Sequence, residues 1–248
     1  MFSSAARGVL NVNNATHAGD RSSILIVGAS RGLGLGLAAE FANREWDVLG
    51  TVRREGTPLH HLAADRPDRV GIETLDMNDK EQTRALRDRL LGQRFDIVFV
   101  NGGIANQMTG DTMADVSADE FSQIMLTNVL GVMRAVEELG VLIRPGGVIG
   151  VMSSGQGSIA NNSNGTNDVY RTSKAALNQA MASYAGRHAT DGRAMILLAP
   201  GWIRTELGGG NAPVGVEEAM PEIADVLVAQ QDTPGLRYLD RRGQPVPW

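Results

Sequence analysis

The stretch Ile24-Leu25-Ile26-Val27-Gly28-Ala29-Ser30-Arg31-Gly32-Leu33-Gly34 joins a short apolar run to three spaced glycines. The apolar run predicts a buried strand that ends at Val27, and the residues from Gly32 onward predict an amphipathic helix. Glycines at such a junction permit a tight turn and close approach of the backbone to a pyrophosphate, while a helix N-terminus supplies free N–H groups. The stretch therefore predicts a nucleotide-binding turn, and a glycine-rich turn without a ligand is the simpler alternative.

The rest of the chain repeats this alternation of short apolar runs and longer amphipathic stretches. We expect strands at 24–27, 48–52, 70–75, 97–100, 148–152, 194–198 and 237–240, and helices at 32–44, 79–91, 117–143, 168–187 and 216–230. Asn78-Asp79 and Ser117 are expected to cap helices, and Pro145-Gly146-Gly147 to end the longest one. The pattern predicts an α/β fold: a Rossmann-type, doubly wound, seven-stranded and mostly parallel sheet with helices on both faces.

Length and composition indicate one globular domain. The chain has 248 residues, of which 42% are hydrophobic, and we assign 22–248 to a single domain. Residues 1–21 lack a sustained apolar period, so we expect a flexible N-terminal extension without a supported targeting signal. The net charge of −5 gives no general reason to expect nucleic acid or an anionic membrane as a partner, and no apolar run is long enough to span a bilayer. We therefore expect a cytoplasmic protein.

The residues that usually bind metals are scarce. Cysteine is absent, which excludes disulfides, thiolate metal sites and cysteine nucleophiles. The four histidines are scattered, and the adjacent pair His60-His61 follows Pro58 in a polar stretch where an exposed loop or a helix start is expected. We predict no metal site.

Tyr170 is followed four residues later by Lys174 within the expected helix 168–187. Positions i and i+4 share a helix face, so the ammonium could lie beneath the phenol, favour its ionised form and lower its pKa from about 10. Such a pair can pass a proton to or from a substrate oxygen. A chance pairing on an exposed helix face is the alternative, although the chain holds only three tyrosines and two lysines.

The glycine turn also spells Gly28-x-Ser30-x-Gly32, the pattern of a hydrolase nucleophile elbow. In those hydrolases several strands precede the elbow and supply an oxyanion loop, whereas Ser30 follows the first expected strand of this chain. A late histidine would also be required, and His188 lies at the end of an expected helix. We therefore favour the nucleotide-binding interpretation.

Two arginines, Arg53 and Arg54, follow the second expected strand, where a fold that prefers NAD often places an acidic residue. Arginines there would attract the 2′-phosphate of NADP, and Arg31 of the glycine turn could approach the same phosphate and stack on the adenine. We expect NADP(H) to be preferred over NAD(H). The alternative is that Arg53 and Arg54 form a solvated strand end.

Further motifs follow in a fixed order: Asp76 after the third strand, Asn128 in the long helix, and Pro200-Gly201 after the sixth strand. With the glycine turn and Tyr170-x-x-x-Lys174, they make residues 23–248 resemble a short-chain dehydrogenase/reductase of the single-domain type. Within that family, segments 153–159, 170–178, 200–205 and 238–248 are similar to the C-factor and sniffer-like carbonyl reductases.

This resemblance implies catalytic roles. Tyr170 would donate a proton to the substrate carbonyl oxygen, and Lys174 would lower the pKa of Tyr170 and bind the nicotinamide ribose. Ser154, chosen over the adjacent Ser153, would donate a hydrogen bond to the substrate oxygen. Asn128 would maintain a helix distortion and a water that links Lys174 to solvent.

The resemblance also implies a cofactor site. It comprises Gly28, Ser30, Arg31, Gly32, Leu33, Gly34, Arg53, Arg54, Asp76, Met77, Asn101, Gly102, Gly103, Tyr170, Lys174, Pro200, Gly201, Trp202, Ile203 and Thr205. The segment Val100-Asn101-Gly102-Gly103 stands where the family usually has Asn-Asn-Ala-Gly, so one Asn is lost and Ala is replaced by Gly, and we expect a looser backbone contact with adenosine there. Tyr170 comes sixteen positions after Ser154, an interval that predicts an extended loop beside the active site.

The resulting expectation is an NADPH-dependent carbonyl reductase or alcohol dehydrogenase. It would transfer a hydride between the nicotinamide and a ketone or aldehyde, its partner being a small carbonyl or alcohol substrate. The alternative is a dinucleotide-binding signalling or regulatory protein of the C-factor type in which catalysis is secondary. The resemblance further implies a homodimer or homotetramer built on the helices that begin near Ser117 and Asp168.

Overall fold

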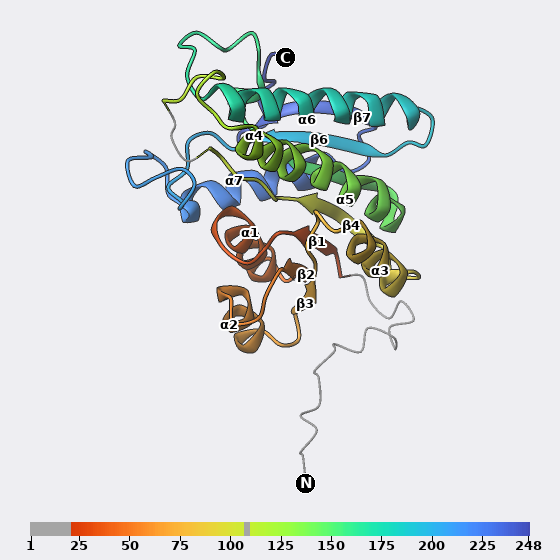
Figure 1. Cartoon of the computed structure of the whole chain (residues 1–248). Coiled ribbons are helices and arrows are strands. Elements are labelled where there is room, and N and C mark those ends of the chain that lie inside the picture. Colours follow the sequence, from red (N-terminus) through yellow and green to blue (C-terminus); the bar gives the residue numbers. More distant parts are fainter. Residues whose placement is uncertain (1–20, 107–109) are drawn as a thin grey trace.

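The computed structural model describes residues 21–106 and 110–248, so the expected N-terminal extension lies, except for Arg21, outside the described residues. Seven parallel strands form one sheet in the order β3-β2-β1-β4-β5-β6-β7 (Figure 1). Their bounds are β1 Ser23–Val27, β2 Asp47–Val52, β3 Val70–Thr74, β4 Phe95–Val100, β5 Ile143–Met152, β6 Ala194–Ala199 and β7 Gly235–Asp240. The doubly wound α/β fold is confirmed, and every strand pair is parallel.

Helices cover both faces of the sheet (Figure 1). One face carries α1 (Gly32–Asn43), α2 (Pro58–Asp65) and α7 (Val216–Ala229), and the other carries α3 (Lys80–Leu90), α5 (Val132–Leu139) and α6 (Asp168–Arg187). All residues of β4 and β6 are buried, because strands at the centre of such a sandwich have apolar neighbours above and below. Helix α2, with Thr57 as its N-cap residue, is absent from the expected helices, and of the two alternatives given for His60-His61 the structure has the helix.

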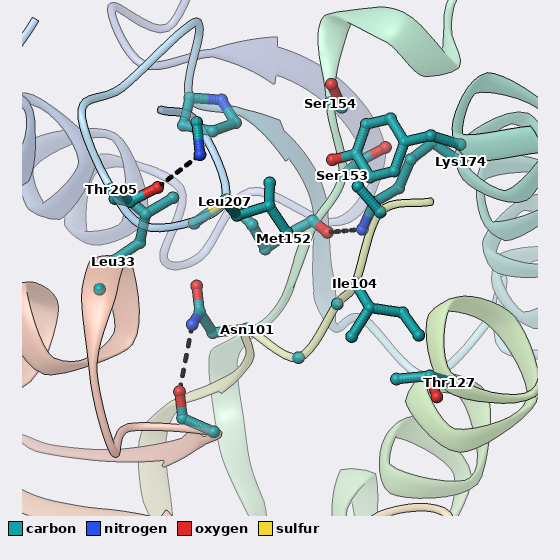
Figure 2. Close-up of a pocket in the computed structure, with 18 of the residues that line it drawn as sticks. Leu33, Asn101, Ile104, Thr127, Met152, Ser153, Ser154, Lys174, Thr205 and Leu207 are labelled. Atoms are coloured by element: carbon teal, nitrogen blue, oxygen red, sulfur yellow. Dashed lines mark hydrogen bonds between the residues drawn. The ribbon is translucent and has the colours of Figure 1, made fainter. Parts of the chain in front are cut away.

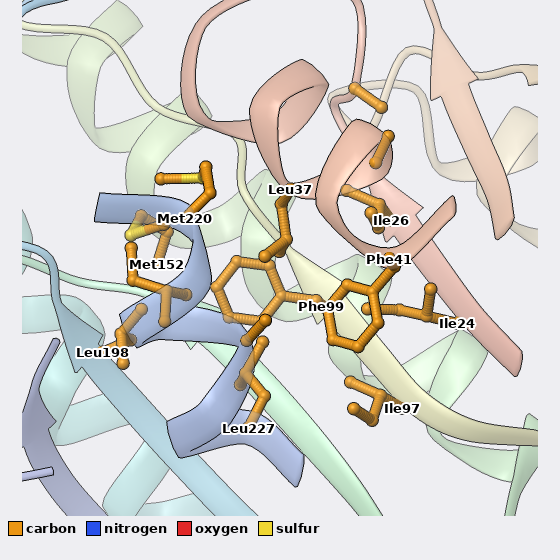
Figure 3. Close-up of a cluster of buried hydrophobic side chains, with 14 of the residues drawn as sticks. Ile24, Ile26, Leu37, Phe41, Ile97, Phe99, Met152, Leu198, Met220 and Leu227 are labelled. Atoms are coloured by element: carbon orange, nitrogen blue, oxygen red, sulfur yellow. The ribbon is translucent and has the colours of Figure 1, made fainter. Parts of the chain in front are cut away.

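The core under α1 and α7 is built around Phe99 of β4 (Figure 3). Glycines give this ring and the helices room: a Cβ at Gly150 would lie 2.4 Å from the Phe99 ring, and one at Gly36 would lie 2.4 Å from Val216 of α7. Close packing of α1 against α7 fixes the glycine turn that precedes α1.

The single long helix expected at 117–143 is wrong in detail. The structure has α4 (Ala118–Met125), a π-helical segment Leu126–Gly131, α5 and a short 3₁₀ turn Gly140–Leu142. A π-helical segment widens one turn and often marks a functional site. Pro145-Gly146-Gly147 lies inside β5 and not after a helix, because β5 begins at Ile143 with a register shift against β4. Ser117 and Asp79 do cap α4 and α3, as expected.

Strands β1 and β4 are neighbours although β2 and β3 come between them in sequence. The chain therefore leaves β1 toward one edge of the sheet and leaves β4 toward the other. Val27 and Val100 pair at the carboxyl ends of the two strands, which sets Gly28 beside Asn101. A crevice opens at such a switch point, where doubly wound folds bind their ligands.

Candidate active site

A cleft of about 950 Å³ lies at this switch point, along the carboxyl ends of the strands. It is lined by all the residues expected in the cofactor and catalytic sites except Gly34, Arg54 and Asn128. Figure 2 shows Leu33 and Asn101 on one side of the cleft and Ser153, Ser154 and Lys174 on the other. The structure thus brings together groups that are up to about 180 positions apart in the sequence.

The glycine turn has the backbone that its sequence indicates. Gly28 and Gly32 adopt φ values of +87° and +58°, a region that disfavours residues with a Cβ. Gly28 N donates to Thr51 Oγ1 at 3.0 Å, and Ala29 N donates to Thr51 O at 2.9 Å, so β2 holds the turn in place. Gly34 serves packing: a Cβ there would lie 2.2 Å from Gly28 O.

These features fit a dinucleotide. Arg31 is the N-cap residue of α1 and makes no side-chain cap, so the first N–H groups of the helix have no side-chain acceptor. The open backbone beside Gly32, where an added Cβ would meet only Thr205 Cγ2 at 3.9 Å, leaves space for a diphosphate against that positive helix end. Ser30 and Leu33 line the same part of the cleft.

The departure at Asn101-Gly102-Gly103 has a packing reason. A Cβ at Gly102 would lie 2.2 Å from Met77 Cε, so the Met77 side chain occupies the space that an alanine would need. Asn101 Nδ2 donates to Gly28 O at 3.1 Å and ties the two strand ends together, while Asn101 Oδ1 is buried without a partner among the described residues. Met77 therefore fills the space beside Gly102, and the looser contact with adenosine stays a prediction.

The arginines expected at the adenosine end are not equivalent. Arg53 lines the cleft beside Asp76, whereas Arg54 lies outside the cleft lining. Arg31 forms a salt bridge with Glu206 across the cleft, so its charge is already partly compensated. Arg53 makes no ion pair within the described part of the chain and is the guanidinium most available to an anion there.

Lys174 is almost fully buried, with 2% of its surface exposed. Its Nζ donates to Met152 O at 3.0 Å, at the end of β5 (Figure 2). The same Nζ lies 5.8 Å from the centroid of the Tyr170 ring. Burial penalises the charged amine and lowers the pKa of Lys174 to about 8. The ammonium is therefore mostly protonated at neutral pH and loses its charge a little above it.

The expected lowering of the Tyr170 pKa is wrong for the protein alone. Burial of the phenol raises its pKa, and this effect outweighs the hydrogen bond with Ser154, which lowers it. Lys174 lies beneath the ring face instead of touching the hydroxyl. Tyr170 is therefore protonated at neutral pH, the state that a proton donor needs.

Ser153 and Ser154 have different environments. Ser153 lines the cleft but is buried, and its Oγ donates to Asn178 Oδ1 at 2.6 Å. Ser154 lines the cleft as well, and it is the serine whose hydroxyl lowers the pKa of Tyr170 through a hydrogen bond. Its backbone carbonyl accepts a hydrogen bond from the Tyr238 hydroxyl, which fixes the turn. Ser154 is thus the serine that can meet a substrate next to Tyr170.

Asn128 lies in the π-helical segment and is fully buried behind the cleft. Its Oδ1 accepts from Ile104 N at 2.8 Å, and its Nδ2 donates to Ile104 O at 2.8 Å and to Ser173 Oγ at 2.9 Å. One side chain thereby joins the loop after β4 to α6. Asn128 is placed to position Tyr170 and Lys174 and does not line the cleft itself.

The segment after β6 closes the cleft on the remaining side. Pro200, Gly201, Trp202, Ile203 and Thr205 all line it. Trp202 Nε1 donates to Gly208 O at 2.6 Å, and Gly208 N donates to Thr205 Oγ1 at 3.0 Å, so the segment is held by its own hydrogen bonds.

Several residues that shape the site were not expected from the sequence. Thr51, Ser173, Asn178 and Tyr238 act through the hydrogen bonds described above, and Arg171 lines the cleft beside Tyr170. The sequence could have indicated Asn178, because it lies four positions after Lys174 and residues i and i+4 share a helix face. Thr51 and Tyr238 carry no local signal, because their partners lie on other strands.

Among residues 21–106 and 110–248, no three His, Asp or Glu side chains gather in a way that could hold a metal ion. In the same ranges, every helix is too short or too polar to cross a bilayer.

Comparisons with known proteins agree with this geometry. A family model described as enoyl-(acyl carrier protein) reductase matches residues 28–227. The chain is 30% identical over 188 residues to 1-hydroxy-2-glutathionyl-2-methyl-3-butene dehydrogenase of a Rhodococcus species, covering 75% of this chain and 80% of the relative. It is 30% identical over 192 residues to the NADPH-dependent pterin aldehyde reductase of Arabidopsis thaliana, covering 74% and 76%. It is 28% identical over 155 residues to the C-signal of Myxococcus xanthus, covering 62% and 92%.

Solved structures are similar over most of the chain. One, described as a short-chain dehydrogenase/reductase from Burkholderia multivorans with bound NADP, is 55% identical with a TM-score of 0.91, covering 92% of this chain and 100% of that one. A carbonyl reductase from Pseudomonas aeruginosa PAO1 in complex with NADP is 36% identical with a TM-score of 0.85 and the same coverage.

The buried ammonium of Lys174 is expected to lower the free energy of unfolding, and the size of this loss should depend on pH. The pKa of Lys174 in the folded protein, about 8, lies below its ordinary value of 10.5. The buried charge therefore destabilises the folded state fully below pH 8, and this destabilisation disappears as the pH rises from 8 to 10.5. Lys174→Met should therefore raise the free energy of unfolding at pH 7 by about 1–3 kcal/mol.

Urea unfolding at pH 7 and pH 10 measures this effect, and the gain should shrink at the higher pH. Lys80→Met replaces the only other lysine, which is exposed at the start of α3, and should change stability by less than about 0.5 kcal/mol. A destabilised Lys174→Met protein at pH 7 would contradict this interpretation of the burial.

Proposed function

Because the chain belongs to the short-chain dehydrogenase/reductase family, and is an NAD(P)-dependent oxidoreductase, we propose that it is an NADPH-dependent carbonyl reductase. The observation that carries the proposal is the Ser154–Tyr170–Lys174 cluster, in which a protonated phenol faces the cleft between a hydroxyl and a buried amine. Its substrate is a small ketone or aldehyde, and the reverse reaction oxidises the corresponding alcohol.

Bound NADPH supplies the hydride that the carbonyl carbon receives. The residues of this chain handle the oxygen. Tyr170 donates its proton to the oxygen as negative charge develops there, and Ser154 donates a hydrogen bond that holds the oxygen in place. The Lys174 ammonium, beneath the ring, stabilises the phenolate that proton transfer leaves behind. Asn128 keeps α6 and the loop after β4 in register for these contacts.

The preference for NADP over NAD rests on charge at the adenosine end. Arg53 lines the cleft without a carboxylate partner among the described residues, so it can bind the 2′-phosphate. Arg31 can join it only by leaving Glu206. The NADP bound to related structures, and the NADPH named for the pterin aldehyde reductase, support the same preference.

A signalling or regulatory role of the C-signal type is the second candidate. The similarity to the C-signal of Myxococcus xanthus favours it, although that similarity covers a smaller part of this chain than the dehydrogenase and reductase relatives do. The complete Ser154, Tyr170 and Lys174 set favours catalysis, because a binding protein has no need to bury an amine at such cost.

We also propose a cytoplasmic homodimer or homotetramer assembled through α4, α5 and α6. Leu130 and Val141 on this side of the sheet are 45% and 51% exposed, which suits an interface. Light scattering should give a mass of two or four times the 26.4 kDa chain, and a monomer at micromolar concentration would contradict this.

Replacing Tyr170 by Phe tests the proton donor. The variant lacks only the hydroxyl, so NADPH should bind within about threefold of wild type while turnover of a carbonyl panel falls by roughly 10²–10⁴-fold. Tyr184→Phe, a buried tyrosine on the same helix that contacts Arg193, is the matched control and should keep its activity. Turnover near the wild-type level in Tyr170→Phe would end the proposal.

Replacing Arg53 by Asp tests the cofactor preference. The ratio of kcat/KM for NADPH to that for NADH should fall by about 10–100-fold, since a charge-assisted contact to phosphate is lost and a repulsive carboxylate is gained. Arg54→Asp makes the same charge change outside the cleft and should alter the ratio by less than about threefold. Equal effects of the two variants would assign the preference to general electrostatics and remove Arg53 from the site.

A further inference from the structure

Arg171 follows Tyr170 directly in the first turn of α6, and both side chains line the cleft. Its Nε donates to Thr166 O at 2.5 Å, and its Nη2 donates to Asn164 Oδ1 at 2.8 Å. These two contacts use the side-on edge of the guanidinium fork. The end-on edge, formed by Nη1 and the second Nη2 hydrogen, has no acceptor within the described residues, which leaves a pre-oriented bidentate donor.

The charges around the cleft leave Arg171 without a counter-ion. Arg31 pairs with Glu206 and Lys174 bonds to a backbone carbonyl, while Arg53 lies at the adenosine end. Asp168, on the same helix turn as Arg171, accepts from Met113 N instead. No carboxylate lies within 4.0 Å of Arg171 in residues 21–106 and 110–248.

The loop that holds Arg171 is polar and uncharged. Gln156, Asn164 and Asn167 face the same end of the cleft, and Asn167 Nδ2 donates to Gln156 Oε1 at 3.2 Å. The extended loop between Ser154 and Tyr170 thus places three amide side chains near the guanidinium of Arg171. An apolar substrate group would bind weakly beside these amides, whereas an anionic group would form a partly desolvated, charge-assisted hydrogen bond with Arg171.

We propose that the carbonyl substrate carries an anionic group, a carboxylate or a phosphate, which the end-on edge of Arg171 binds while Tyr170 and Ser154 take the carbonyl oxygen. This rests on the proposed carbonyl reductase function. The chain as a whole has a net charge of −5 and would repel an anion, so recognition depends on this local cation.

The experiment compares matched aldehydes: 4-carboxybenzaldehyde and its neutral methyl ester, reduced with saturating NADPH. Wild type should prefer the acid by at least about tenfold in kcat/KM. Arg171→Gln should remove that preference, mainly by raising KM for the acid, and leave the ester within about threefold. Arg171→Lys keeps the charge without the fork and should retain part of the preference. Arg94→Gln removes an exposed arginine whose side chain donates to Gln93 O, far from the cleft lining, and should behave as wild type.

Loop anchoring is separated from substrate binding by Asn164→Ala, which cuts one anchor but keeps the charge. The acid preference should survive in Asn164→Ala. Equal losses for acid and ester in Arg171→Gln, or the absence of an acid preference in wild type, would overturn the inference and leave the reductase proposal standing.

A ligand-binding measurement distinguishes the anion site from the reductase function if no aldehyde is reduced. Calorimetry with NADP⁺-loaded protein should show benzoate binding more tightly than benzamide in wild type and equally in Arg171→Gln. Benzoate binding that depends on Arg171, without turnover of any aldehyde, would contradict the reductase function and support the anion site. Equal binding of benzoate and benzamide to wild type would sink the anion site.

Discussion

The electrostatics of the cleft depend on one buried amine. Lys174 is buried near the N-terminal end of α6, where Met152 O is its hydrogen-bond acceptor and the Tyr170 ring lies over its ammonium. Burying an ammonium is unfavourable, and the lowered pKa of Lys174 expresses that cost. The rest of the fold supplies the hydrophobic free energy that offsets it. A protein that keeps so costly a group inside a cleft has a use for its charge.

The sheet determines where that charge lies. Parallel strands place their carboxyl ends on one edge, so the glycine turn after β1, Asn101 after β4 and Ser154 after β5 converge although they are far apart in sequence. Gly103 keeps the approach to Lys174 open, since an added Cβ would lie 3.3 Å from its Nζ. The π-helical segment turns Asn128 inward, where it joins the β4 loop to α6. Local backbone geometry thus sets the position of each of these side chains.

The fold could be predicted from sequence because its signals are local. Apolar runs of four to six residues, glycines at a strand end and capping residues such as Asp79 each act within a few positions. The strand start at Ile143 was missed because Pro145-Gly146-Gly147 usually marks a helix end, and only pairing with β4 extends the strand through it. The difference between Arg53 and Arg54 was also hidden, since it depends on which side chain turns toward the cleft.

The electrostatics of the site were harder to predict. Helical spacing correctly places Lys174 under Tyr170, yet it carries no information on burial, which reverses the direction of the Tyr170 pKa. The choice between Ser153 and Ser154 likewise depends on partners from another element, since the Ser153 hydroxyl donates to Asn178 of α6 whereas the Ser154 hydroxyl bonds with Tyr170.

The most direct measurement is a crystal structure of the protein with NADP⁺ and a carbonyl compound bound. The account predicts a diphosphate against the glycine turn at Gly32, and the Tyr170 hydroxyl about 2.6–3.2 Å from the carbonyl oxygen with Ser154 on the same oxygen. A Tyr170 hydroxyl turned away from the carbonyl, or a dinucleotide bound elsewhere than at the glycine turn, would contradict it.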